Sequence, residues 1–333
     1  MLRILILLVS LAAFFPAYGA EACTSATPAC TDWINLDGQA RALVYRTYPL
    51  DKKNSKITRA LIVVHGAGRD ADNYFRTALA AAFLAGAFDD TIVISPRFAS
   101  NNGRGCNDKL DQNEINWSCS GDSWRSGGQA TGSKLTSYDL MDEILRKLAR
   151  KDDFPNLKVI VVSGHSAGGQ YVTRYEMANR VHDTLGIPIN YVVSNPSSYA
   201  YVDPERPTGA NGELRAFGDA RNCTTYDNWP YGLKNRSGYT ANIADDQLRK
   251  QLAARGATYL LGELDILPLG GFDSSCPAMG QGPTRLARGQ AFVNYVNQKY
   301  KAQHKVIVIP LCGHNARCMF TAELALPILF PKL

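Results

Sequence analysis

Residues 157–169 read LKVIVVSGHSAGG, and this stretch decides the fold. The segment 157–162 is short and, apart from Lys158, apolar and rich in β-branched residues, which is typical of a strand buried on both faces of a parallel sheet. GHSAG at 164–168 follows directly and opens a segment that is compatible with a helix to about Arg180. A serine between two glycines in a sharp strand-to-helix turn has the pattern of a nucleophile elbow. Ser166 is therefore the candidate nucleophile.

Strand and helix patterns alternate on both sides of this stretch. Predicted strands cover 59–65, 91–95, 157–162, 189–194, 258–261 and 305–309. Predicted helices cover 72–85, 136–150, 168–180, 245–254 and 284–300, followed by a last short helix. This alternation predicts a mostly parallel sheet with helices on both faces.

Two long segments between these elements show no sustained period. Residues 96–133 are rich in Gly, Asn, Asp and Ser and are interpreted as a long loop, a kind of segment that often forms the rim or lid of a site. Residues 196–244 are interpreted as a loop-rich insertion that caps the site. No linker or repeat divides the chain, which predicts a single domain over residues 21–333.

The sequence also offers a base and an acid for Ser166. A serine hydroxyl is a poor nucleophile unless an imidazole accepts its proton. Among five histidines, His314 follows the last predicted strand in PLCGHN (310–315), where the base is expected after the acid. The segment LLGELD (260–265) ends the preceding strand, so Asp265 is the first choice for the acid that orients the imidazole. Glu263 and Asp273 are the alternatives.

The negative oxygen that develops during acyl transfer needs preorganised N–H donors. The backbone amide of Ala167, directly after the nucleophile, is one candidate for this oxyanion hole. The second is Ala67 in the turn HGAG (65–68), with Gly68 as the alternative. His65 itself is interpreted as a structural residue of that turn, and His165 as a side chain that packs beside the serine.

Eight cysteines follow the first twenty residues. An exported chain with eight cysteines favours four disulfides, and the spacing lacks the paired CxxC pattern of a zinc site, so no metal or other cofactor is expected. Short loops favour Cys23–Cys30, Cys106–Cys119 and Cys312–Cys318, which leaves Cys223–Cys276.

Residues 1–20 have one basic residue, a short apolar run and small residues at their end, as in a secretory signal peptide. The residues Gly19, Ala20 and Ala22 all remain possible cleavage positions. The chain is therefore expected to be secreted or periplasmic, without stable membrane insertion. The net charge of +6 is spread without a basic run, so nucleic acid is not an expected partner.

Aromatic side chains gather in the two irregular segments, and the sequence leaves two interpretations open. They line an apolar substrate cleft, or they fill the core under the long loops. They are Trp117, Trp124, Tyr199, Tyr201, Trp229 and Tyr231.

Four segments in order, HGAG, GHSAGG, GELD and CGHN, make the chain resemble the α/β-hydrolase superfamily from about residue 59 onward. The resemblance implies an α/β-hydrolase fold. Within the superfamily the chain is similar to secreted microbial esterases and polyester depolymerases, although Ala167 stands where many cutinase-like polyesterases have methionine. It also resembles uncharacterised exported hydrolases with segments like those at 65–75 and 194–199 (SNPSSY).

These observations predict a secreted serine hydrolase that cleaves carboxylic esters through an acyl-enzyme on Ser166. The substrate is an ester-containing small molecule or polymer. A peptidase or amidase with the same three residues is the alternative, and a non-catalytic binding protein on a hydrolase scaffold is the third interpretation.

Overall fold

The computed structural model describes residues 21–103, 106–119, 123–208 and 213–333, so the predicted signal peptide at 1–20 lies outside the described residues. The described residues form an eight-stranded sheet and a separate two-stranded one. The strands are β1 (Thr31–Asn35), β2 (Arg41–Arg46), β3 (Arg59–Val64), β4 (Thr91–Pro96), β5 (Val159–His165), β6 (Ile189–Ser194), β7 (Glu205–Thr208), β8 (Glu213–Ala216), β9 (Ala257–Gly262) and β10 (Lys305–Ile309). The α-helices are α1 (Ala71–Leu84), α2 (Ser137–Leu148), α3 (Ala167–Ala178), α4 (Asp245–Ala254), α5 (Cys276–Met279), α6 (Arg285–Tyr300), α7 (Ala316–Thr321) and α8 (Leu326–Leu329).

The large sheet has the strand order β1-β2-β4-β3-β5-β6-β9-β10. The six strands from β4 to β10 in this order run parallel, and β1 and β2 are antiparallel additions at one edge. The predicted mostly parallel sheet is confirmed. The sequence analysis did not predict β1 and β2, which are short: in β1 only Ile34 is buried, and in β2 buried and half-buried residues alternate.

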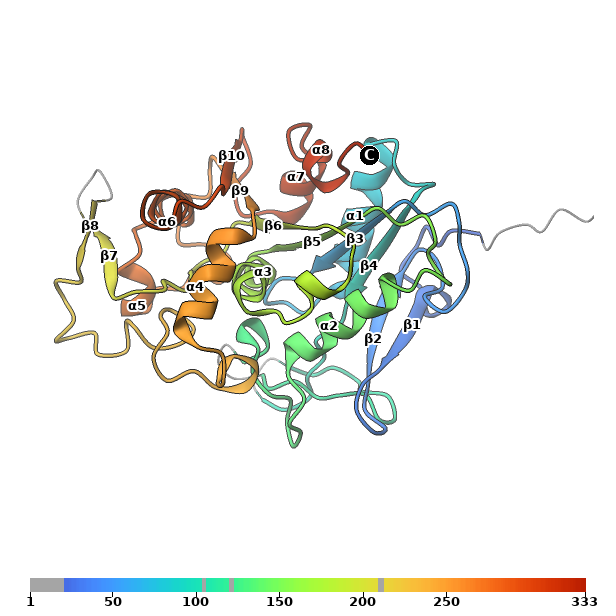
Figure 1. Ribbon diagram of the computed structural model, residues 1–333, viewed down its shortest axis with the longest axis horizontal. Helices are drawn as coiled ribbons and strands as arrows, with labels where there is room; N and C mark the ends of the chain where they lie inside the picture. Colours follow the sequence, from blue (N-terminus) through green and yellow to red (C-terminus); the bar gives the residue numbers. More distant parts are fainter. Residues whose placement is uncertain (1–20, 104–105, 120–122, 209–212) are drawn as a thin grey trace, which may run out of the picture.

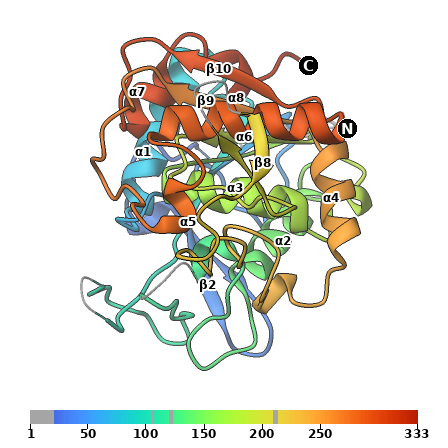
Figure 2. The same cartoon turned by 90° about the vertical axis from the view of Figure 1, so that its left-hand side faces the viewer.

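Helices cover both faces of the sheet, and side chains of the central strands alternate between the two layers (Figure 1). On β3, Ile62 and Val64 join a core that includes α2, α3, α4 and α6. Leu61 and Val63 join the core on the opposite face, under α1, α7 and α8. Figure 2 views the β10 end of the molecule, where α6 packs beside α4. Burial on both faces explains the continuous apolar sequence of the strand.

Side-chain hydrogen bonds cap the first turns of α2 and α6. Thr136 and Asp139 form a capping box at the start of α2, and Thr284 caps α6 by accepting a hydrogen bond from the amide of Ala287. The sequence analysis predicted one short helix near the C-terminus, and the structure has two, α7 and α8. Ala322 adopts an extended conformation that separates them.

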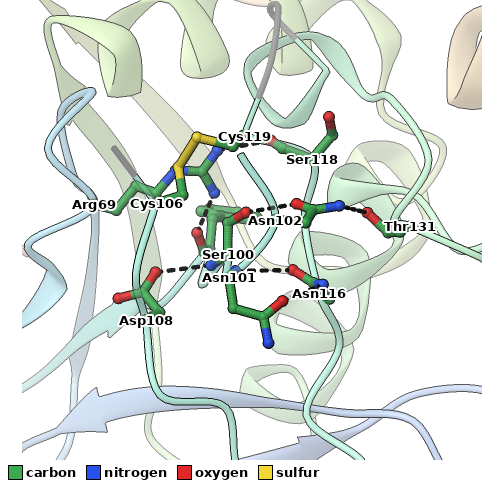
Figure 3. Close-up of a disulfide and its surroundings, with 11 residues drawn as sticks. Arg69, Ser100, Asn101, Asn102, Cys106, Asp108, Asn116, Ser118, Cys119 and Thr131 are labelled. Atoms are coloured by element: carbon green, nitrogen blue, oxygen red, sulfur yellow. Dashed lines mark hydrogen bonds between the residues drawn. A yellow bond between two sulfur atoms is a disulfide. The ribbon is translucent and has the colours of Figure 1, made fainter. Parts of the chain in front are cut away.

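The long loop after β4 is held by the Cys106–Cys119 disulfide and by hydrogen bonds that its side chains make within the loop (Figure 3). Asp108 accepts a hydrogen bond from the amide of Ser100, and Asn116 donates one to Asn101. The eight cysteines form four disulfides, in the pairs that the sequence analysis predicts: Cys23–Cys30, Cys106–Cys119, Cys223–Cys276 and Cys312–Cys318.

The segment 196–244 contains the hairpin of β7 and β8, which the sequence analysis did not predict. The Cys223–Cys276 disulfide joins this segment to α5, which lies on the loop after β9. The division into one domain and the role of this segment as a cap stay predictions.

Candidate active site

Ser166 lies at the turn between β5 and α3, with φ +59° and ψ −118°. A non-glycine residue rarely adopts this conformation, which costs about 1–3 kcal/mol and persists only where its surroundings enforce it. Here the amide of Ser166 donates a 2.9 Å hydrogen bond to the carbonyl oxygen of Ser194 at the end of β6. The turn therefore holds the serine side chain outward at the carboxyl edge of the sheet.

Backbone atoms near Ser166 leave no room for a side chain at three glycine positions. A Cβ on Gly164 would lie 2.3 Å from the carbonyl oxygen of Gly168, and a Cβ on Gly168 would lie 2.1 Å from that of Val64. A Cβ on Gly169 would lie 2.5 Å from the carbonyl oxygen of Ser194. Because each contact is with backbone, no side chain fits at these positions.

The loop after β10 brings His314 to Ser166. The Nε2 atom of His314 lies 2.9 Å from the Oγ atom of Ser166, although 148 positions separate the two residues. The Cys312–Cys318 disulfide closes the loop around His314. A Cβ on Gly270 would lie 3.0 Å from the Cδ2 atom of His314, so the backbone of the 266–271 loop packs against the imidazole.

Asp265 lies behind His314. Its Oδ2 atom is 2.8 Å from the Nδ1 atom of His314, and its side chain is buried. A carboxylate only accepts, so Nδ1–H donates to Asp265 and Nε2 is left to accept the proton of Ser166. Glu263 is exposed and accepts from the amide of Leu311, while Asp273 accepts from the hydroxyl of Tyr231. Of the three carboxylates considered, only Asp265 contacts His314.

The sequence analysis missed Arg285, a fully buried arginine in the first turn of α6. Its Nη1 atom lies 3.2 Å from the Oδ1 atom of Asp265, the oxygen that does not face His314. Its Nε atom donates to the Oγ atom of Ser197 at 2.6 Å, and its Nη2 atom donates to the carbonyl of Gly270 at 2.9 Å. Burial lowers the pKa of the Arg285 guanidinium, and the charge of Asp265 opposes that effect. Arg285 thus joins the acid to the loop that packs on the base.

Asn195 is the second residue that sequence reasoning missed. Its buried side chain accepts a 2.8 Å hydrogen bond from the amide of Gly262 and donates a 3.2 Å one to the carbonyl of Gly313. Gly262 ends β9, three residues before Asp265, and Gly313 directly precedes His314. The signal was present in SNPSSY, which follows a central strand at the edge where the other motifs converge.

Two further histidines lie near the serine and are buried. His165 packs its ring 4.7 Å from the ring of His314, and its Nδ1 atom is hydrogen-bonded to the hydroxyl of Tyr74 at 3.0 Å. Burial and the charge of His314 hold the pKa of His165 well below its usual range. Burial lowers the pKa of His65 to about 4, and its Nε2 atom accepts a hydrogen bond from the amide of Phe98. Both imidazoles are therefore neutral near pH 7.

The two amides predicted for the oxyanion hole lie in turns beside Ser166. Ala167 is the first residue of α3, where backbone N–H groups have no partner within the helix. Ala67 lies in the turn after β3, and a Cβ on its neighbour Gly66 would lie 3.7 Å from the Cβ of Ser166. Arg69 anchors this turn to the disulfide loop by donating to the carbonyls of Phe98 and Ser118 (Figure 3).

A pocket of about 870 Å³ opens beside Ser166 and His314. Its walls are the first half of α1, α7 from its first to its last residue, the turn 66–68 and the glycines 270–271. No described residue of the segment 196–244 lines it, and neither do Trp117 or Trp124. The cleft interpretation of the aromatics is therefore wrong for this pocket. The buried ones fill the core instead: Trp117, Trp124, Tyr199 and Tyr201.

No group of three or more His, Cys, Asp or Glu side chains suited to a metal ion occurs within residues 21–103, 106–119, 123–208 and 213–333. The chemistry available at the site is that of a hydroxyl, an imidazole and a carboxylate connected by hydrogen bonds.

Comparison with protein families agrees with this arrangement. The model of the alpha/beta hydrolase family matches residues 61–325, which covers the elbow and both loops after β9 and β10. The chain belongs to the alpha/beta hydrolase family. The chain is therefore a hydrolase by family, and the fold that the motifs predicted is confirmed.

Two solved structures resemble the chain over most of its length. One is poly(aspartic acid) hydrolase-1 from Sphingomonas sp. KT-1, with 20% identity and a TM-score of 0.64 over 94% of this chain and 100% of that one. The other is the poly(3-hydroxybutyrate) depolymerase LpqC from Bordetella parapertussis, with 19% identity and a TM-score of 0.61 over 88% of this chain and 85% of that one. At this identity they establish a shared fold. A search of curated protein sequences finds no match.

Proposed function

We propose that this hydrolase is an exported serine esterase that cleaves carboxylic esters through an acyl-enzyme on Ser166. The observation that carries the proposal is the series of two hydrogen bonds from Ser166 through His314 to the buried carboxylate of Asp265. Such a series lets an imidazole accept the hydroxyl proton while a carboxylate stabilises the imidazolium that forms.

In the proposed reaction, the Oγ atom of Ser166 attacks the ester carbonyl carbon as its proton moves to the Nε2 atom of His314. The amides of Ala167 and Ala67 donate hydrogen bonds to the oxyanion of the tetrahedral intermediate. His314 then returns the proton to the leaving alcohol, and the acyl group remains on Ser166. A water that gives its proton to His314 hydrolyses this acyl-enzyme and restores the free serine.

Export is supported by the sequence of residues 1–20 and by the four disulfides, which persist in oxidising compartments. In the described part of the chain, the helices lack the length and apolar character needed to span a bilayer.

The test is hydrolysis of a short p-nitrophenyl ester by the purified mature protein, compared with Ser166→Ala. The proposal predicts turnover by the wild-type protein and a rate close to background for the variant. Equal rates in the two proteins would exclude the mechanism. A parallel amide panel, read by amine release, distinguishes an esterase from a peptidase or amidase that uses the same three residues.

A further inference from the structure

The hydroxyl group of Tyr74 lies between the two turns that carry the candidate oxyanion-hole amides. Tyr74 is a buried residue in the first turn of α1 and lines the pocket beside Ser166. Its Oη atom lies 3.0 Å from the Nδ1 atom of His165, which ends β5. On the other side, a Cβ on Gly66 would lie 2.8 Å from the same Oη atom. The hydroxyl group is therefore within reach of both turns.

The donors and acceptors around this hydroxyl group follow from the chemistry of its partners. Burial raises the pKa of Tyr74, and a hydrogen bond with the backbone of Gly66 opposes that effect. Only a donor stabilises a phenolate, so the amide of Gly66 donates to the oxygen of Tyr74. His165 is neutral near pH 7, because burial holds its pKa well below the usual range. A neutral imidazole accepts at one nitrogen, so Tyr74 donates its own proton to Nδ1.

The two ends of this bridge precede the groups that carry the chemistry. Gly66 directly precedes Ala67, and His165 directly precedes Ser166 and Ala167. An oxyanion hole stabilises the transition state only where its donors converge on one oxygen, each at about 3 Å. A change in the separation of the two turns lengthens one of these hydrogen bonds. The separation of the turns is thus part of the catalytic geometry.

The sheet topology shows why the bridge on this side is needed. In the sheet, β3 lies between β4 and β5, so the turn after β3 has the loop after β4 on one side and the elbow after β5 on the other. Arg69 fixes the turn to the loop after β4 by donating to the carbonyls of Phe98 and Ser118. The hydrogen bond from Tyr74 to His165 fixes the same turn to the elbow.

We propose that Tyr74 is a positioning residue, whose hydroxyl group holds the turn of Ala67 at a fixed separation from the elbow so that the amides of Ala67 and Ala167 donate to the same oxyanion. The inference rests on the acyl-enzyme mechanism proposed above. It predicts that loss of the hydroxyl group weakens the binding of species that carry an oxyanion, whereas the binding of an uncharged ligand of the same shape is retained.

The experiment compares the wild-type protein with Tyr74→Phe, using two ketones that have the same alkyl chain. A trifluoromethyl ketone adds to Ser166 as a hemiketal whose charged oxygen occupies the oxyanion hole, and the methyl ketone binds without that addition. Tyr74→Phe is expected to raise the Ki of the trifluoromethyl ketone about tenfold and to lower kcat/KM for a p-nitrophenyl ester by about the same factor. The Ki of the methyl ketone is expected to change less than about twofold, because it makes no use of the oxyanion hole.

The matched control is Tyr171→Phe in α3. The hydroxyl group of Tyr171 is buried and donates a 2.8 Å hydrogen bond to the carbonyl of Ser137 at the start of α2, so its loss is expected to leave kcat/KM and both Ki values unchanged. A double-mutant cycle tests the bridge itself. In a His165→Leu background, Tyr74→Phe is expected to have little further effect, since the partner of the hydroxyl group is already absent. Melting temperatures of all variants check that the fold is retained.

Equal Ki values of the trifluoromethyl ketone in the wild-type protein and Tyr74→Phe would overturn the proposal and leave ester hydrolysis untouched. A similar rise for both ketones would also overturn it, because Tyr74 would then shape the pocket and not the oxyanion hole. Additive effects in the cycle with His165→Leu would reject the bridge. A wild-type protein that binds both ketones equally and does not hydrolyse the ester would contradict the acyl-enzyme mechanism, and this inference with it.

Discussion

The contact between Arg285 and Asp265 leads to a prediction about the dependence of activity on pH. A positive charge behind Asp265 opposes the positive charge that His314 acquires when it is protonated. Replacing Arg285 with glutamine removes that charge while keeping a side-chain donor. One positive charge fewer then opposes the charged form of the imidazole, so the acid limb of kcat/KM against pH is expected to move upward.

The magnitude follows from the geometry. The Nη1 atom of Arg285 lies 3.2 Å from one oxygen of Asp265, and the other oxygen lies 2.8 Å from His314. The guanidinium and the imidazole are therefore roughly 7 Å apart, which at an effective dielectric constant of about 20 gives about 2 kcal/mol. Solvent screening reduces this energy because His314 is partly exposed at the pocket mouth, and the expected displacement of the acid limb is upward.

The assay is kcat/KM for a neutral p-nitrophenyl ester from pH 4.5 to 9. Arg285→Lys preserves the charge, so its acid limb is expected to stay near that of the wild-type protein even if its rate falls. Arg288→Gln is the matched control. Arg288 lies buried one turn further along α6 and donates a hydrogen bond to the carbonyl of Ser197. Its hydrogen bonds within the described part of the chain do not include one to Asp265.

An acid limb in Arg285→Gln that coincides with the wild-type limb would refute the electrostatic role of Arg285. An equal displacement in Arg288→Gln would show that the effect is a general loss of buried charge. A loss of rate at every pH without displacement would show that Arg285 only supports the fold.

Three further predictions concern the framework of the site. Gly168→Ala is expected to destabilise the fold by about 3 kcal/mol or more, since its Cβ would meet a carbonyl oxygen at 2.1 Å; an unchanged melting temperature would contradict this. Asn195→Ala is expected to lower kcat about tenfold or more by freeing the loops of the acid and the base, and wild-type turnover would argue against that role. Because burial lowers the pKa of His65 to about 4 from an ordinary value near 6.5, only the unfolded chain takes up its proton between these values. Stability is therefore lost as pH falls from about 6.5 to about 4, by up to about 3 kcal/mol from this residue. Urea unfolding of His65→Gln should show a weaker dependence over this range, and an identical slope would be inconsistent with it.

The sequence predicted the parts of the fold whose chemistry is local. Residues 159–162 of β5 are apolar throughout because the sheet is covered on both faces, and GHSAG has steric requirements that few other turns share. The side chains at 265 and 314 follow predicted strands, whose carboxyl ends meet at one edge of a parallel sheet. That reasoning located the residues that the structure brings together around Ser166.

Tertiary contacts decided the features that the sequence did not predict. Arg285 lies in a helix, and nothing in its neighbours distinguishes a buried arginine bonded to Asp265 from one that faces solvent. Trp117 and Trp124 have the composition of a cleft or of a core, and only the packing under the disulfide loop selects the core.

The central claim is that His314 activates Ser166. The most direct measurement is the rate of labelling by a fluorophosphonate, followed by intact mass and peptide mapping. The account predicts one adduct per wild-type molecule, on Ser166, and labelling slowed about 10³-fold or more in His314→Ala. Labelling at another residue, or an equal rate in the two proteins, would contradict it.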